Sequence, residues 1–340
     1  MGFKRLDAED FVVSADAVQS VAWSTGAPTL TAYFTSSVQA AGSSGNYYLS
    51  VYQTSSTLSE TAVQFDIAYA DVLGSGSEYF NSAITDRTPS STTFGQYRSL
   101  VLEDENANFT FGDGTNLITG SNFWVISPER ARYKEKLFPG TFNLSLSGSN
   151  GLIQLTDNSN DVTTQTFLGT TRVFQIVSGS NGSAYSTTGY VAGSGSYGLF
   201  LPDIATIILN PDAISQSIHV ETDRSANLTN GTNQATLYDA LVLGATASLG
   251  FTLNAEETIT SDYVFVRSRN AEFNYSANPS FISGSTGEVI YSSFINNPQV
   301  YVTTVGMYND ANELVAVAKL SRPLLKDFTK ESLVRVKLDF

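Results

Sequence analysis

Regular alternation of apolar and polar residues near the C-terminus gives the clearest structural signal in the sequence. Residues 300–308 and 314–320 both alternate with period two, and they flank the turn-forming segment 309–312, so they predict a β-hairpin. Both faces of the first strand are largely apolar or β-branched, which predicts a central position in a sheet. Pro323 lacks a backbone N–H, and we therefore expect the second strand to end before it.

The final segment, residues 333–340, is predicted to be a further strand. Arg335 and Lys337 fall on one of its faces. The opposite face carries only apolar residues, namely Val334, Val336, Leu338 and Phe340. One cationic face and one buried face are therefore expected, and the chain should end inside its own sheet.

The same periodicity predicts mainly extended structure elsewhere. We expect strands at residues 47–53, 62–69, 109–112, 122–127, 141–146, 152–155, 172–177, 206–209 and 263–267. Helical spacing is present at residues 89–102, where Pro89 suits a first turn, and a short helix is expected at residues 236–243. The predicted fold class is mainly β, with a few short helices.

Changes in composition along the chain predict its domain organisation. Residues 149–249 are rich in Ser, Thr, Asn and Gly and carry few charges, which suggests an inserted β-rich domain. Residues 46–148 and 250–340 would then form one discontinuous, β-sandwich-like core domain. Residues 1–45 are poorly patterned and are expected to be an N-terminal arm or extended segment, lying either on its own domain or on a neighbouring chain. A length of 340 residues allows two or three domains with full cores.

Cysteine content and charge exclude several classes of function. The absence of cysteine excludes disulfides, thiolate metal sites and cysteine nucleophiles, and it fits assembly in a reducing cytoplasm. The net charge of −14 argues against nucleic acid as a partner, because phosphate binding requires clustered Lys and Arg. No run of 18 apolar residues exists, and the charged first ten residues are not followed by the apolar h-region of a signal peptide, so neither a membrane span nor a signal peptide is expected.

Candidate metal and catalytic residues have ordinary structural explanations. His219 is the only histidine, which excludes metal sites with two histidines and leaves any triad dependent on one residue. Asp157 and Asp161 flank polar residues as in calcium loops, but the internal Gly and the later Glu are missing, so a hairpin turn is preferred. The sequence therefore predicts no metal, no cofactor and no catalytic residue.

Three further patterns are candidate sites for sugars or phosphates. The acidic groups Glu103–Asp104–Glu105 and Glu256–Glu257 could serve glycoside hydrolysis, although their neighbours are typical of solvated turns. Segments 74–77 and 193–196 alternate Gly and Ser but lack the Lys of a phosphate loop. Aromatic residues that could stack on sugars, but more often pack in cores, are Tyr185, Tyr190, Tyr197 and Phe200.

Four segments carry a resemblance to a known family. They are TVGMYNDANELVAVAKLSRPLLKDFTKESLVRVKLDF (304–340), FDIAYADVLGSGS (65–77), YRSLV (97–101) and ERARYKEKLFPGTFNLSLSG (129–148). These segments resemble structural proteins encoded by contractile-tailed phages of marine cyanobacteria and their relatives. The resemblance is weaker over residues 149–249. It implies a virion building block of the tail or baseplate and brings no catalytic residues with it.

The residues alone favour an assembly or binding module that is not an enzyme. With the resemblance, we expect a non-catalytic structural subunit of a bacteriophage virion, assembled in the host cytoplasm and contacting other tail or baseplate proteins. Homo-oligomerisation stays open. A neck, collar or head-surface (decoration) protein is the alternative within this class, and a carbohydrate-binding module or glycosidase is the alternative from another class.

Overall fold

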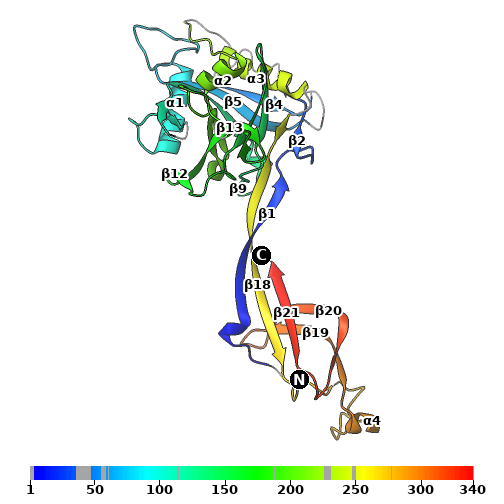
Figure 1. The fold of residues 1–340 in the computed structure, drawn as a ribbon. Helices are drawn as coiled ribbons and strands as arrows, with labels where there is room; N and C mark the ends of the chain where they lie inside the picture. The colour runs from blue at the N-terminus through cyan, green and yellow to red at the C-terminus, as the bar shows by residue number, and fades with distance from the viewer. Residues whose placement is uncertain are drawn as a thin grey trace. The chain divides into compact units, whose positions relative to one another are not determined.

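The computed structural model describes residues 4–35, 47–54, 59, 61–112, 115–186, 189–225, 231–246, 250–276 and 278–339. The described chain is mainly β, with few and short helices (Figure 1). The expected fold class is therefore confirmed. Phe340, expected at the end of a buried face, lies outside the described residues.

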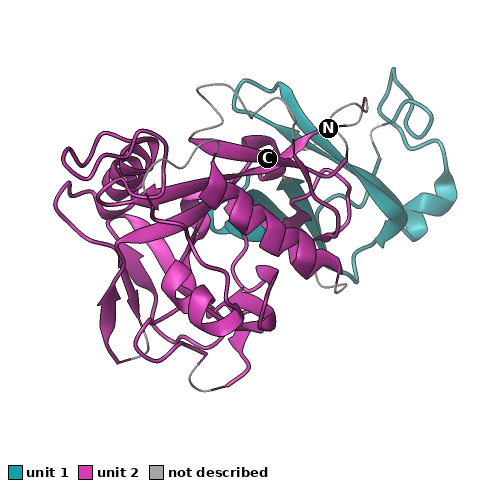
Figure 2. Cartoon of the chain, turned by 90° about the horizontal axis from the view of Figure 1, so that it is seen from above, with its two compact units in different colours: residues 1–17, 258–340 teal, residues 18–257 magenta. Residues whose placement is uncertain are grey.

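The chain forms two compact units (Figure 2). Unit 1 combines residues 1–17 with residues 258–340, and unit 2 comprises residues 18–257. A discontinuous arrangement is thus present, but its boundaries differ from those expected. Residues 149–249 are not a unit of their own, because their strands share one sheet with strands from residues 46–148. The amino-acid composition changes at Ser149, but the residues before and after it belong to the same compact unit.

Unit 2 is built on a 13-stranded sheet. Its main path has the order β2-β17-β10-β11-β13-β15-β16-β8-β5-β4-β3, and β12 and β14 pair with β13. The strands are β2 (Thr29–Leu30), β3 (Phe34–Thr35), β4 (Tyr48–Tyr52), β5 (Val63–Asp71), β8 (Asn122–Pro128), β10 (Asn143–Gly148), β11 (Gly151–Asp157), β12 (Thr166–Leu168), β13 (Thr171–Ser180), β14 (Ser183–Ala184), β15 (Gly198–Leu201), β16 (Thr206–Leu209) and β17 (Phe251–Thr252).

Both faces of this sheet are packed. In β5, Phe65, Ile67 and Tyr69 belong to one buried cluster, whereas the alternate residues Ala68 and Ala70 belong to a second. Side chains alternate across a strand, so the two clusters lie on opposite faces of the sheet. β8 and β16 divide their residues between the clusters in the same way, and this part of the sheet is therefore buried on both sides.

Three helices of unit 2 cover these faces. They are α1 (Pro89–Leu102), α2 (Pro211–Ile218) and α3 (Thr232–Thr246). α1 packs with the cluster that contains Ala68, Ala70 and Phe123. α2 and α3 pack with the cluster that contains Phe65, Ile67 and Trp124. The helix predicted at residues 89–102 is confirmed, and its N-cap Thr88 accepts a hydrogen bond from the Ser91 N–H. α3 is longer than expected, and α2 was not predicted.

Several short elements complete unit 2. β6 (Thr110–Gly112) and β7 (Leu117–Thr119) form a separate two-stranded sheet. β9 (Lys136–Leu137) pairs with the beginning of β18 at Ala255 and Glu256. Single 3₁₀ turns occur at Arg130–Arg132 and Pro202–Ile204.

Unit 1 contains two small sheets. In the first, β18 (Asn254–Ser268) lies between β1 (Phe11–Val21) and β21 (Ser332–Asp339). The second consists of β19 (Val300–Tyr308) and β20 (Leu314–Lys326). Unit 1 also contains a 3₁₀ turn at Ala8–Asp10 and helix α4 (Ser292–Asn296).

Two expectations for the C-terminal hairpin were wrong. β19 is not central, since β20 is its only strand neighbour among the described residues. β20 also continues through Pro323 to Lys326. The register between the two strands shifts between Val302 and Thr304, and this bulge accommodates a residue that cannot donate to the ladder.

Candidate assembly surface

His219 lies at the C-terminal end of helix α2. It is the C-cap of α2, with φ of 62°, and its backbone N–H donates to the Ser215 carbonyl at 3.0 Å. Its exposed side chain lies 3.8 Å from Glu221. The conformation of His219 is that of a helix C-cap, and its side chain is exposed.

Asp157 and Asp161 hold two different loops. The Asp157 side chain is buried, and its Oδ2 accepts a hydrogen bond from the Gly140 N–H at 2.8 Å. Burial raises the pKa of Asp157, while hydrogen bonds from Ser159 and Gly140 act in the opposite direction. Asp161 instead accepts a hydrogen bond from the Ala184 N–H at 2.7 Å. Within the described part of the chain, no three His, Cys, Asp or Glu residues gather as metal ligands.

The acidic groups proposed for glycoside chemistry are engaged separately. Glu103 accepts hydrogen bonds from the backbone N–H and the hydroxyl of Thr170 at 3.2 and 3.1 Å. Glu256 lies 3.7 Å from Lys136, and Glu257 lies 2.7 Å from Lys134. Glu103, Glu256 and Glu257 therefore each make a local contact, and these three contacts are separate from one another.

The aromatic residues considered for sugar stacking do not share one environment. Tyr197 and Phe200 are buried in the core of unit 2, whereas Tyr185 is exposed and Tyr190 is half-buried. The Tyr185 hydroxyl donates to Gln154 Oε1. Core packing explains two of these four residues, so the sequence did not locate a stacking platform here.

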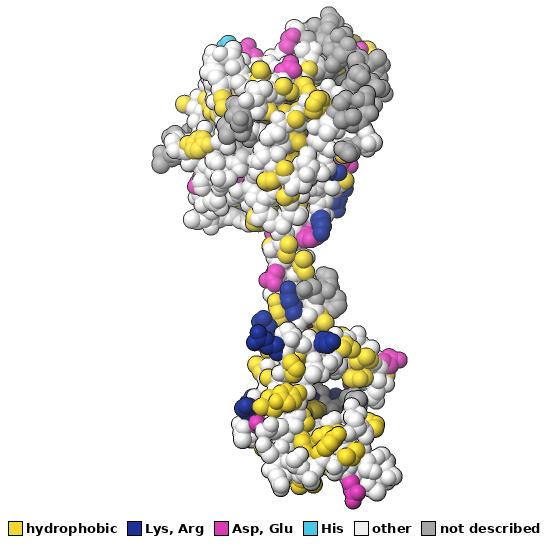
Figure 3. Space-filling view, turned by 90° about the vertical axis from the view of Figure 1, so that its right-hand side faces the viewer, with side chains coloured by type: hydrophobic (Ala, Val, Ile, Leu, Met, Phe, Trp, Pro, Cys, Tyr) yellow, Lys and Arg dark blue, Asp and Glu magenta, His cyan; other side chains and the backbone are white. Residues whose placement is uncertain are grey.

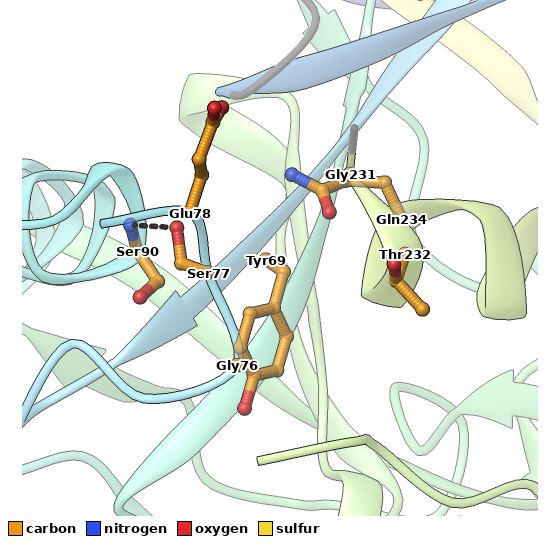
Figure 4. A pocket seen from close by; sticks show the side chains of 8 residues that line it. All are labelled: Tyr69, Gly76, Ser77, Glu78, Ser90, Gly231, Thr232 and Gln234. Atoms are coloured by element: carbon orange, nitrogen blue, oxygen red, sulfur yellow. Dashed lines mark hydrogen bonds between the residues drawn. The ribbon is translucent and has the colours of Figure 1, made fainter. Parts of the chain in front are cut away.

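A small hollow lies beside the Gly74–Ser77 loop (Figure 4). Its lining is formed by Tyr69, Gly76, Ser77, Glu78, Ser90, Gly231, Thr232 and Gln234. The Ser90 N–H donates to Ser77 Oγ at 3.3 Å, which closes the loop onto the start of α1. A volume of about 10 Å³ holds roughly one water molecule, so the hollow is too small for a substrate.

Unit 1 has an unusual interior. Among its described residues, the only buried hydrophobic side chains are Val264 and Val336. The buried polar or charged side chains are Ser261, Asn274, Lys326 and Asp327. Hydrophobic burial is the main favourable term in folding, so this unit derives little stability from a core of its own.

Lys326 is the most deeply buried charge in this interior. Its side chain is 0% exposed, and its ammonium donates to Asn274 Oδ1 at 2.7 Å and to the Asn270 carbonyl at 3.0 Å. The third donor reaches the Asp327 carbonyl at 3.1 Å. These bonds fix the end of β20 to residues 270–274 by polar contacts. The sequence offered no signal for this role, since nothing distinguishes Lys326 from solvated lysines.

The β19–β20 hairpin exposes large hydrophobic residues. We call Tyr308, Leu314, Val315 and Val317 the hairpin patch, and their side chains are 41%, 54%, 68% and 58% exposed. Gly306 pairs with Val317, and a Cβ at Gly306 would lie 3.2 Å from the Tyr308 ring and 3.3 Å from Leu314. Tyr308, Leu314 and Val317 therefore lie together around Gly306. Hydrophobic side chains gather over unit 1, the lower part of Figure 3.

The cationic face predicted for the last strand is present. Tyr263 pairs with Lys337 and Phe265 with Arg335, so these residues share one face of β18 and β21. The Arg335 guanidinium and the Lys337 ammonium lie 5.3 and 6.0 Å from the centre of the Tyr263 ring. On the opposite face, Val336 is buried and Val334 and Leu338 are half-buried.

Basic residues are concentrated in unit 1. This unit has ten Lys and Arg against twelve Asp and Glu, a formal net charge of −2, whereas unit 2 has eight against twenty, a net charge of −12. The overall acidity of the chain therefore hides a unit that is close to neutral and carries exposed cations.

Comparisons with known proteins give no match. No protein-family model, curated protein or solved structure matches the chain significantly. A search of the described helices finds none with the length and apolar character needed to cross a membrane.

Proposed function

We propose that this protein is a non-catalytic structural subunit of a bacteriophage virion, located in the tail or baseplate. Its role would be to make protein–protein contacts during assembly in the host cytoplasm, with other virion proteins as partners. The virion assignment is supported by the resemblance of residues 304–340 and three other segments to phage structural proteins. The assembly role is supported by the surface of unit 1.

The hairpin patch is the observation that carries this proposal. A two-stranded hairpin is marginally stable by itself in water, and continuous exposed apolar surface commonly marks a binding site. β19 and β20 expose Tyr308, Leu314, Val315 and Val317 to solvent in the single chain. A partner that covers these residues would stabilise the hairpin and form the contact at the same time.

Complementation during infection tests the proposal. A phage lacking this gene would be supplied with the wild-type chain or with Val315→Asp/Val317→Asp. The matched control is Leu100→Asp/Leu117→Asp, which changes two exposed residues of unit 2. We expect the wild-type and control chains to enter purified particles and the hairpin variant to remain soluble and unincorporated. Equal incorporation of both variants would contradict the role of the patch.

Gold-labelled antibodies against unit 2 would locate the chain in the particle. Labelling at the tail or baseplate supports the proposed position. Labelling at the neck, collar or head surface would select the alternative position, and absence of the wild-type chain from purified particles would contradict the virion role itself.

A further inference from the structure

We infer that unit 1 binds a second copy of this chain, with β1 of one copy pairing along the free edge of β21 of the other. This inference rests on the proposed function in so far as both assign an assembly role to unit 1. It names the partner and the strands, which the hairpin patch does not.

The two strands are the outer strands of one sheet. The order is β1-β18-β21, so within the described residues β1 and β21 each have one strand neighbour in this sheet's path. Outer strands present unpaired backbone donors and acceptors, and proteins cover, charge or pair such edges. Pairing β21 with β1 of a neighbour would use both edges and continue the sheet from chain to chain.

β1 has the surface of a strand awaiting a partner. None of its 11 residues is buried, and Phe11, Val12 and Val13 are 50%, 48% and 69% exposed. β21 has eight residues, so β1 is long enough to cover its full length. A solitary apolar edge of this kind is an aggregation hazard unless a partner covers it.

The faces of the two strands are complementary. Ser14 and Asp16 share one face of β1, and Ser14 Oγ lies 3.4 Å from Asp16 Oδ1. The alternate face of β1 carries Phe11, Val13, Ala15 and Ala17. When Asp16 lies opposite the Arg335 and Lys337 face of β21, the apolar face of β1 meets Val334, Val336 and Leu338.

Charge disfavours the symmetric alternatives. Antiparallel pairing of two β21 strands would bring Arg335 and Lys337 opposite cations of the second copy, and like charges directly opposite destabilise a strand pair. Antiparallel pairing of two β1 strands centred on Asp16 would place the two Asp16 side chains opposite each other, and β1–β1 pairing in any register would leave both cationic edges uncovered. An interface between β1 of one copy and β21 of the next is heterologous, because the two copies contribute different strands. When every copy makes both contacts, the copies form a closed ring or an open filament.

Engineered cysteines test this pairing, because the chain has no cysteine of its own. Full-length Ala17→Cys would be mixed with Val334→Cys, Val336→Cys or Leu338→Cys, which together cover both strand directions with Asp16 opposite either cation. Within one chain β18 separates β1 from β21, so their backbones lie about 10 Å apart, beyond the reach of a disulfide. A bond between the two variants can then form only between copies.

We expect oxidation to give a mixed disulfide for at least one pair, in excess of the control pair Leu117→Cys with Val334→Cys. Asp16→Lys in the first chain should lower the rate of bond formation by about fivefold or more, and Arg335→Asp/Lys337→Asp in the second should restore it. Circular dichroism would establish that each variant is folded.

Absence of the bond above the control, or indifference to both charge changes, would overturn this inference. If the bond is absent while Val315→Asp/Val317→Asp still fails to enter particles, the pairing fails and the proposed function stands. If the bond forms but the wild-type chain is absent from particles, the proposed function fails and the pairing stands.

Discussion

The two units of this chain are both β-rich, yet they place their hydrophobic residues in opposite ways. Unit 2 packs both faces of one sheet, with clusters around Trp124 and Phe123. Of the described hydrophobic residues of unit 1, only Val264 and Val336 are buried, and the hairpin patch is exposed. Secondary structure content alone therefore does not indicate whether a unit has a hydrophobic core of its own. Unit 2 has the interior of an independent domain, whereas unit 1 leaves large hydrophobic side chains exposed.

The largest effect is expected in the core of unit 2. Trp124 is fully buried, and its indole N–H donates to the Asn233 carbonyl at 2.8 Å. Trp124→Ala should lower the free energy of unfolding by about 3–5 kcal/mol, because it leaves a cavity and an unpaired carbonyl. Urea denaturation followed by circular dichroism would measure the change. The control Leu117→Ala alters an exposed residue and should stay within about 0.5 kcal/mol of wild type.

A smaller and local effect is expected from the buried lysine of unit 1. Lys326→Met removes three hydrogen bonds and leaves the buried oxygen acceptors of Asn274 and Asp327 without this donor, which should cost about 1–3 kcal/mol. Hydrogen exchange should accelerate in residues 270–274 and 320–328 and remain unchanged in β5 and β8. The exposed residue Lys330 gives the matched variant Lys330→Met. Equal exchange in both variants would show that Lys326 does not hold this region.

The ion pair of Arg172 and Asp203 should contribute less, about 1 kcal/mol or below, because it is partly exposed. Burial would raise the pKa of Asp203, but hydrogen bonds from the Arg172 side chain and backbone outweigh burial and hold that pKa below its ordinary value. A lowered pKa gives stability that is present above the unfolded pKa and is lost as pH falls through the folded pKa.

Asp203→Asn should therefore be less stable than wild type at pH 7, and the difference should disappear as the pH falls below the ordinary carboxyl range. Thermal unfolding at several pH values would measure it. A difference that persists or grows in acid would contradict the assigned direction.

The smallest effect on folding is expected in the hairpin patch. Val317 is largely exposed, so Val317→Ser should change the free energy of unfolding by less than about 0.5 kcal/mol. The same change should weaken incorporation into particles. A loss of stability comparable to that of Trp124→Ala would show that Val317 belongs to a core, and the contrast between the units would fail.

Local periodicity predicted individual strands and α1 correctly. It did not predict which elements pack beside each strand. The alternation in residues 62–69 correctly indicated one face of β5, because burial on one side of a strand repeats with period two. The apolar residues of 300–308 predict a central strand, whereas none of the residues of β19 is buried. The hydrophobicity of a residue indicates that its burial is favourable, but it does not identify the segment or chain that packs against it.

The domain boundary could not be predicted from composition for a related reason. The Ser-, Thr- and Asn-rich segment 149–249 supplies β11, β13, β15 and β16 to the same sheet as β5 and β8. Its apolar residues, such as Phe174 and Phe200, fall at inward positions and supply a large share of that core. The role of Lys326 was equally inaccessible, since it depends on a loop 52 residues earlier in the chain.

Hydrogen exchange of the intact chain at low and high protein concentration tests most directly whether unit 1 depends on a partner. We predict that β5, β8 and β16 exchange slowly at both concentrations, because their protection comes from the core of unit 2. β19, β20, β21 and residues 11–17 of β1 should exchange rapidly in dilute solution and become protected as the concentration rises. Slow exchange of these unit 1 strands in a dilute monomer, at a rate independent of concentration, would contradict the account.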